Sequence, residues 1–196
     1  MDFLFNSTSD NRSIYLFDGV YPWTAQSVIK DLIKMNKDSS EPINMFINSP
    51  GGRAIDGFAI IDVMNVIEAP VNTIILGSAA SCGSLISSQG DKRFISENSE
   101  LMIHEAAIQG FGAIDTRSGE YEEMMKDLKG LNDKVSNIYA DASGKSFEEI
   151  SELLGSKKDI YMNPKEAIEF GLADAVLSKE ELSNIKLSEA FAKINL

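Results

Sequence analysis

Short apolar runs alternate with longer segments of helical periodicity in the first half of the chain. The apolar runs expected to form buried strands are residues 13–17, 43–47 and 71–76. Residues 24–35 carry an apolar stripe on one face, with Thr24 as the expected N-cap, and residues 54–67 predict a second, mostly apolar helix. Strands that alternate with helices favour parallel pairing with helical crossovers, which is an α/β architecture.

The second half contains three further short apolar runs and is otherwise mainly helical. Its expected strands are residues 92–95, 100–104 and 160–162. A long amphipathic helix is expected over 120–142, and a capping box beginning at Ser146 starts another helix. Asn163 as a cap and Pro164 in the first turn predict a further helix, which Gly171 ends.

Composition and charge exclude several classes of protein. The 196 residues are 43% apolar and 24% charged, which indicates one globular domain of ordinary size. The net charge of −12 repels nucleic acid and anionic membranes, so we expect neither as a partner. A single cysteine, an N-terminus without a basic signal-peptide region and the absence of a membrane-length apolar run together predict a cytoplasmic protein.

Eight consecutive small residues, Gly77-Ser-Ala-Ala-Ser-Cys-Gly-Ser84, follow the third expected strand. Small side chains are needed where a strand turns sharply into a helix, and this run predicts such a turn. Ser81 would then lie near the start of the helix, where free amides and the helix dipole stabilise an oxyanion. On this stretch alone, Ser81 as a structural N-cap is the simpler interpretation, and Ser81 as a nucleophile is the alternative.

A nucleophilic serine requires a base and a third group that orients the base. His104 is the single histidine and ends an expected strand, where side chains can project into a crevice at the sheet edge. Asp159 precedes another expected strand and is a candidate orienting acid. Spacing alone does not distinguish it from the other candidates, Asp91, Glu105, Asp115 and Asp174.

Several blocks of sequence, in order and at matching spacing, resemble the Clp protease proteolytic subunit family. The blocks are Asn48-Ser-Pro-Gly-Gly52, Gly77-Ser-Ala-Ala-Ser-Cys-Gly83, Lys92-Arg-Phe94 with Asn98-Ser99, Met102-Ile-His104, and Asp159 before Pro164-Lys-Glu-Ala167 and Gly171-Leu-Ala-Asp174. Each block alone is a weak signal, and Ser-Pro-Gly-Gly by itself would also suit a plain turn. The ordered set runs from about Ser13 to Val176 and is highly specific.

The resemblance implies a fold, a reaction and a set of site residues. The fold is crotonase-like, built of repeated β-β-α units with a protruding handle helix. The reaction is hydrolysis of peptide bonds in unfolded polypeptides or peptides, without cofactor or metal. The implied residues are a catalytic triad of Ser81, His104 and Asp159, an oxyanion hole from the backbone of Gly52 and Cys82, and a substrate-binding strand region at Gly51, Gln109, Gly110 and Phe111.

The resemblance also implies how the chain is organised and assembled. It predicts one peptidase domain over residues 1–196, with a short arm at 1–12, a handle at 109–142 and a C-terminal tail at 178–196. Rings of subunits would pair through the handle into a homo-oligomeric chamber. The Met- and Tyr-rich face of the helix from Glu120 favours such an assembly, because a monomer would expose it.

Some features depart from the family's pattern. Only twelve residues precede the first expected strand, which puts a partnership with an AAA+ unfoldase in doubt. Glu105-Ala106 follows the histidine, and Lys158 replaces an arginine whose contacts between rings it cannot reproduce. Shortened relatives of this kind include the Clp-like head-maturation proteases of tailed phages, so a bacterial or a phage-encoded protein in a host cytoplasm is expected.

Three alternatives to an active peptidase remain at this point. A catalytically idle ring subunit would have a structural or binding role. A crotonase-fold enzyme acting on acyl-CoA would need paired glutamates and a CoA pocket, which the sequence does not reveal. A Ser–Lys signal-peptide peptidase using Lys92 would need a membrane segment, and none is present in the sequence.

Overall fold

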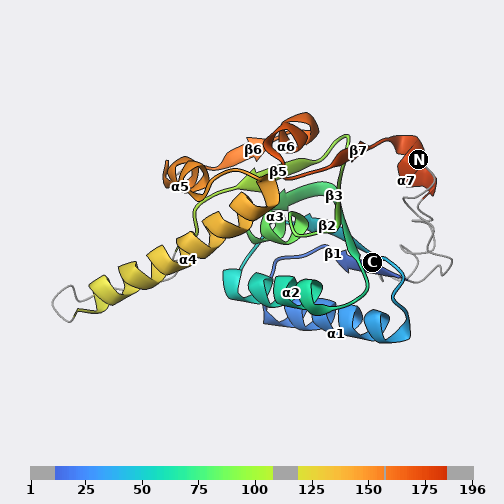
Figure 1. Ribbon diagram of the computed structural model, residues 1–196, viewed down its shortest axis with the longest axis horizontal. Coiled ribbons are helices and arrows are strands. Elements are labelled where there is room, and N and C mark those ends of the chain that lie inside the picture. The colour runs from blue at the N-terminus through green and yellow to red at the C-terminus, as the bar shows by residue number, and fades with distance from the viewer. Residues whose placement is uncertain (1–11, 108–118, 157, 185–196) are drawn as a thin grey trace.

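One mixed sheet with helices packed against it forms the body of the protein (Figure 1). The computed structural model describes residues 12–107, 119–156 and 158–184. The strands are β1 (Ser13–Leu16), β2 (Ile43–Ser49), β3 (Val71–Ala80), β4 (Lys92–Ser96), β5 (Glu100–Ile103), β6 (Ile160–Met162) and β7 (Ala175–Leu177). The helices are α1 (Pro22–Asp38), α2 (Ala54–Val66), α3 (Cys82–Ser87), α4 (Glu120–Ser143), α5 (Phe147–Gly155), α6 (Pro164–Phe170) and α7 (Lys179–Asn184). The expected substrate-binding residues Gln109, Gly110 and Phe111 lie outside the described residues. So do the first eleven residues and most of the C-terminal tail.

The strands of the described chain are ordered β1-β2-β3-β4-β7, with β5 beside β3 and β6 beside β5. All of these pairs are parallel except β5 with β6. The α/β architecture expected from alternating strands and helices is therefore confirmed, and the β5–β6 pair adds one antiparallel edge.

The strand β3 extends four residues beyond the end that the sequence predicts. Its first half pairs with β4 from Asn72 to Ile75, and its second half pairs with β5 from Ser78 to Ala80. Residues 77–80 were expected to belong to the turn because a sharp strand-to-helix turn needs small side chains, and that expectation is wrong. The backbone stays extended because pairing with two successive neighbours outweighs the local preference.

The start of α1 is a second correction. The helix begins at Pro22, after Tyr21 as the N-cap, and continues to Asp38. Thr24 is therefore the third helical residue and not the N-cap, and its hydroxyl accepts a hydrogen bond from the Tyr21 amide at 2.8 Å. Proline is favoured in the first turn because its missing N–H has no intrahelical partner there. The caps predicted at Ser146, Asn163 and Gly171 are confirmed.

Both faces of the central strands are apolar, as expected for a parallel sheet covered on two sides. The main core lies between the sheet and the helices, and its fully buried strand residues include Ile43, Met45 and Ile75. A smaller cluster on the opposite face contains Phe46, Ile74, Phe94 and Leu177. Successive residues of β2 and β3 alternate between the two clusters, so each strand contributes to both.

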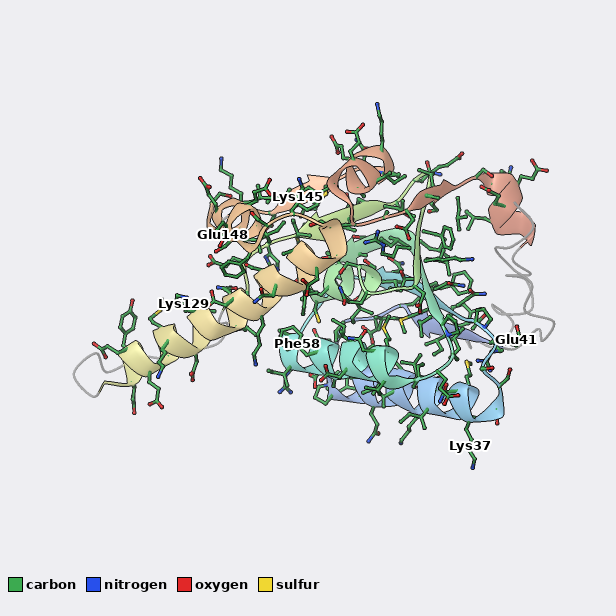
Figure 2. All side chains as sticks on the ribbon, viewed as in Figure 1. Lys37, Glu41, Phe58, Lys129, Lys145 and Glu148 are labelled. Atoms are coloured by element: carbon green, nitrogen blue, oxygen red, sulfur yellow. The ribbon has the colours of Figure 1, made fainter. Side chains whose placement is uncertain are left out.

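The helix α4 divides into a buried half and a projecting half (Figure 1). All of its buried residues, Val135, Ser136, Tyr139 and Ala140, belong to the C-terminal half. The projecting half carries Lys129 (Figure 2), and its Tyr121 and Met125 side chains are 42% and 41% exposed. A protruding handle helix was expected, and the fold agrees. None of the helices in the described residues is both long and apolar enough to cross a membrane.

Candidate active site

Ser81 lies in the sharp turn between β3 and α3, with φ 53° and ψ −121°. Among the described residues other than glycine, Ser81 alone has a positive φ. Such a conformation costs on the order of 1–3 kcal/mol and persists only where surrounding contacts hold it. One such contact runs from the Ser81 amide to the carbonyl of Met102 on β5, at 2.9 Å. The turn therefore presents the Ser81 side chain at the carboxyl end of the sheet.

The Ser81 hydroxyl bonds to a histidine and does not cap the helix. His104 Nε2 lies 2.6 Å from Ser81 Oγ, within hydrogen-bond distance, and Ser81 makes no side-chain cap bond. The strand register explains why these two side chains lie together. Ala80 of β3 pairs with Met102 of parallel β5, so the segments that follow the two strands leave the sheet side by side. Ser81 is thus the backbone N-cap of α3, but its side chain is available for chemistry.

Asp159 lies on the other side of the His104 ring. Ile103 pairs with Ile160 in the antiparallel β5–β6 ladder, which places Asp159 opposite His104. Asp159 Oδ1 is 3.4 Å from His104 Nδ1, an ion-pair distance that is long for a hydrogen bond. The two side chains are 54% and 31% exposed, so solvent reaches this contact.

The other candidate acids have different positions. Asp174 pairs with Arg93, and Asp91 accepts a hydrogen bond from the Val71 amide at 2.7 Å. Glu105 directly follows His104 in the chain, and Asp115 lies outside the described residues. Within the described chain, the structure therefore brings Ser81, His104 and Asp159 together and leaves the other acids elsewhere.

The Gly51-Gly52 loop packs directly against the turn at Ser81. Val20 accepts a hydrogen bond from the Arg53 amide and donates one to the Gly51 carbonyl, both at 2.8 Å. This parallel bridge leaves the Gly52 N–H directed away from Val20. A Cβ on Gly51 would lie 2.6 Å from the Ala80 carbonyl and 2.9 Å from the Cys82 amide nitrogen, so only glycine permits this approach.

A groove of about 490 Å³ contains this cluster. The groove is lined by Ser81 and His104, by Tyr21 and the glycine loop, and by Leu131 and Val135 of α4. The amphipathic pattern predicted the helix that carries Leu131 and Val135, but not that these residues line the site. Tyr21 was missed altogether, because nothing in its local sequence connects it with residues sixty positions away.

Cys82 follows Ser81, but its thiol is poorly suited to act as a nucleophile. Burial raises the pKa of its thiol to about 12, so the reactive thiolate is scarce near neutral pH. Its side chain points away towards α2, with Sγ 3.6 Å from the Arg53 carbonyl. What Cys82 can offer to the groove is its backbone N–H. In the part of the chain that the structure describes, no three His, Cys, Asp or Glu side chains gather as metal ligands would.

Comparison with known proteins connects this geometry with one family. The sequence profile described as Clp protease matches residues 2–180. The ATP-dependent Clp protease proteolytic subunit 1 of Protochlamydia amoebophila is 35% identical over 175 residues, which cover 88% of this chain and 83% of that protein. The ATP-dependent Clp protease proteolytic subunit of Leuconostoc citreum is 36% identical over 158 residues, covering 79% and 77% of the two chains.

A solved structure agrees with the sequence comparisons. A single-site mutant of ClpP1 from Listeria monocytogenes superposes with a TM-score of 0.78 at 28% identity, covering 88% of this chain and 95% of that one. The profile match, the relatives and the fold agree along nearly the whole chain. The protein therefore belongs to the Clp protease family and is a serine-type peptidase.

Proposed function

We propose that Ser81, His104 and Asp159 form the catalytic triad with which this peptidase cleaves unfolded polypeptides or peptides inside a homo-oligomeric chamber. The observation that carries the proposal is the 2.6 Å contact between His104 Nε2 and Ser81 Oγ, made by a serine held in a strained turn. A general base within hydrogen-bond reach of a hydroxyl is the arrangement that activates a serine nucleophile.

Each group has a defined role in the proposed reaction. His104 takes the Ser81 proton as Ser81 Oγ attacks the peptide carbonyl, and it then gives the proton to the leaving amine. The Gly52 and Cys82 amides stabilise the tetrahedral oxyanion. Water, activated by His104, then hydrolyses the acyl-serine and frees the carboxyl product. Asp159 keeps the proton of the neutral imidazole on Nδ1 and stabilises the imidazolium.

The position of the glycine loop supports the proposed oxyanion hole. The Gly52 N–H is directed away from Val20, and Gly51 packs against the Cys82 amide, so both donors lie beside the nucleophile turn. Gly51, together with Gln109, Gly110 and Phe111, is proposed to pair with an extended substrate. The apolar wall from α4 would then contact substrate side chains.

The alternatives receive less support from the described residues. Within the described part of the chain no glutamate lines the groove, whereas the acyl-CoA hypothesis required paired glutamates at the site. Lys92 begins β4 opposite Asn72, at the far end of β3 from Ser81, so it is poorly placed to serve as a Ser–Lys base. An idle ring subunit would have no need for the His104–Ser81 contact.

A serine-directed fluorophosphonate probe tests the proposal on the intact protein. We expect one covalent adduct, which peptide mass spectrometry locates on Ser81 and not on the neighbouring Ser78 or Ser84. The Ser81→Ala variant serves as the matched control and should remain unlabelled. An assembled wild-type protein that forms no adduct on Ser81 would support the idle-subunit alternative.

The projecting half of α4 supports the proposed assembly into rings that pair face to face. Tyr121 and Met125 are each about two-fifths exposed on a helix that projects from the body. Burying them against another copy would remove apolar surface from water. We also propose a cytoplasmic location, and we do not assign an unfoldase partner.

Light scattering tests the assembly. The wild-type protein should have a mass many times the 21.5 kDa of one chain. Replacing both Tyr121 and Met125 by lysine should lower that mass, whereas Lys126→Glu, a charge change on the exposed surface of the same turn, should not. A wild-type monomer at high concentration would contradict the proposed chamber.

A further inference from the structure

Two buried hydroxyl groups form a chain that ends on the carbonyl of Ser81. Tyr139 Oη lies 2.7 Å from Ser84 Oγ, and Ser84 Oγ donates to the Ser81 carbonyl at 2.7 Å. Tyr139 Oη is also 3.4 Å from that carbonyl. The exposed fraction is 1% for Tyr139 and 0% for Ser84, so no bulk water competes for these hydrogen bonds.

The direction of the hydrogen bonds follows from the number of protons. Ser84 has one hydroxyl proton, and a carbonyl can only accept, so that proton goes to the Ser81 oxygen. Tyr139 then donates to Ser84 at 2.7 Å, because its 3.4 Å contact with the Ser81 carbonyl is too long to be its main hydrogen bond. Burial raises the pKa of the Tyr139 hydroxyl, which keeps it protonated and able to donate across the working pH range. The order is therefore Tyr139 to Ser84 to Ser81.

The held carbonyl matters because it belongs to the Ser81–Cys82 peptide group. This group is planar and trans, so its carbonyl and its N–H point in opposite directions. A contact that fixes the Ser81 carbonyl consequently fixes the direction of the Cys82 N–H. That N–H is one of the two proposed oxyanion donors, and such donors act only when they are aimed at the developing charge.

We propose that Tyr139 and Ser84 are positioning residues of the peptidase, whose hydroxyl chain aims the Cys82 amide at the oxyanion. The inference rests on the proposed function, because it takes Ser81 as the nucleophile. Two backbone bonds also reach the Ser81 carbonyl, from the Ser84 amide at 3.0 Å and the Leu85 amide at 3.1 Å. The hydroxyl chain adds a restraint from α4, across the groove, that the helix α3 cannot supply by itself.

The test removes each hydroxyl and measures kcat and KM per active site, with active sites counted by fluorophosphonate labelling. Ser84→Ala should lower kcat about 3- to 10-fold with KM nearly unchanged, the effect of weakening one buried hydrogen bond. Tyr139→Phe should have a smaller effect, because Ser84 can still donate to the carbonyl. The double variant should resemble Ser84→Ala, since both hydroxyls act in one chain.

Ser88→Ala is the matched control. Ser88 is buried and donates to the carbonyl three residues earlier, that of Leu85, at 2.8 Å, but it does not reach the nucleophile. It should change kcat less than twofold even if it lowers thermal stability as much as Ser84→Ala. The acidic limb of the pH profile should be the same in all variants, because His104 keeps its contacts.

The outcomes separate this inference from the proposed function. If wild-type Ser81 is not labelled, the proposed function fails. If Ser81 is labelled but Ser84→Ala and Tyr139→Phe both retain wild-type kcat, the hydroxyl chain is only structural and the inference fails. Should Ser84→Ala not fold, Tyr139→Phe decides alone, since it removes one oxygen and keeps the ring that fills the core.

Discussion

The two sides of the His104 ring are built in different ways. Towards Ser81 the contact is 2.6 Å, and it joins residues that follow the paired strands β3 and β5. Towards Asp159 the contact is 3.4 Å, the carboxylate side chain is 54% exposed, and β6 is a three-residue edge strand. The hydrophobic core sets the first contact, whereas the periphery of the sheet sets the second.

This difference predicts unequal sensitivity to substitution. Core pairing holds Ser81 and His104 through many buried contacts, so their geometry persists without help from Asp159. A solvent-exposed ion pair is typically worth only about 0–1 kcal/mol. Asp159, the proposed orienting acid, is therefore expected to be the adjustable part of the site, and its environment is the part that assembly with other copies can still change.

The largest effect is expected on the Ser81 side of the ring. Ser81→Ala and His104→Ala should each lower kcat/KM by about 1,000-fold or more, and the double variant should be no worse than either. Hydrolysis of a fluorogenic peptide measures this directly. If the loss of kcat/KM in the double variant equalled the product of the two single losses, the two residues would not act as a unit.

Gly52→Ala tests the same side without altering the two side chains. A Cβ on Gly52 would collide with the backbone of Val20, so the loop must shift and move the Gly52 amide. We expect a loss of about 100- to 1,000-fold in kcat, the usual effect of removing one oxyanion donor.

Gly130→Ala is the control for this substitution. No atom of the described residues lies within 4 Å of a Cβ at Gly130, in the projecting half of α4, so the helix should become more stable and activity should not change. Equal activity in wild type and Gly52→Ala would remove Gly52 from the proposed site.

Asp159→Asn should have an intermediate effect. We expect kcat/KM to fall by about 10- to 100-fold, less than the roughly 10,000-fold effect known for a buried triad aspartate, because this pair is exposed. Asp141→Asn, which changes an exposed acid on α4, should leave kcat/KM as it is. A loss as large as that of Ser81→Ala would show that the contrast between the two sides is false.

The smallest effect should come from weakening the support of β6. Asn163 caps α6 directly after β6 by accepting from the Glu166 amide at 3.0 Å. Asn163→Ala should lower the free energy of unfolding by about 1 kcal/mol and kcat/KM by no more than about twofold. Thermal denaturation and peptide hydrolysis measure the two quantities.

Ser146→Ala provides a matched comparison for the Asn163 prediction. Ser146 caps α5 with the same reciprocal geometry, accepting from the Glu149 amide at 3.1 Å. Ser146→Ala should lower stability by a similar amount without lowering kcat/KM, because Ser146 lies at the N-terminal end of α5, the end farther from Asp159 along the chain, whereas Asn163 directly follows β6. If Ser146→Ala reduced activity as much as Asn163→Ala, the activity change would reflect overall stability.

Much of the fold could be predicted because local chemistry agrees with the global structure. The capping residues at Ser146 and Asn163 and the stop at Gly171 act within one turn of the chain, so the sequence alone reveals them. The two errors arose where distant contacts outweighed local preference. Residues 77–80 stay in β3 because β5 pairs with them, and α1 begins earlier than Thr24 suggested.

The candidate site was predictable to the extent that its residues have unusual local signals. Ser81 lies in a run of small residues, His104 is the single histidine, and the ordered blocks connect both with a known family. Asp159 also belongs to those blocks, but its spacing alone did not distinguish it from the other acids, and the register of β6 against β5 explains its position. Tyr21, Ser84 and Tyr139 were not foreseen, because each acts through a partner on another element.

The sequence by itself determined the alternation of strands and helices, the helix caps and the residue types capable of acyl transfer. These follow from spacing and side-chain chemistry over a few neighbouring residues. Only the tertiary structure decided which acid lies beside the imidazole, which walls enclose the groove and which hydroxyls hold the Ser81 carbonyl. Those depend on strand register and helix packing, which bring together residues twenty to sixty positions apart that no local pattern relates.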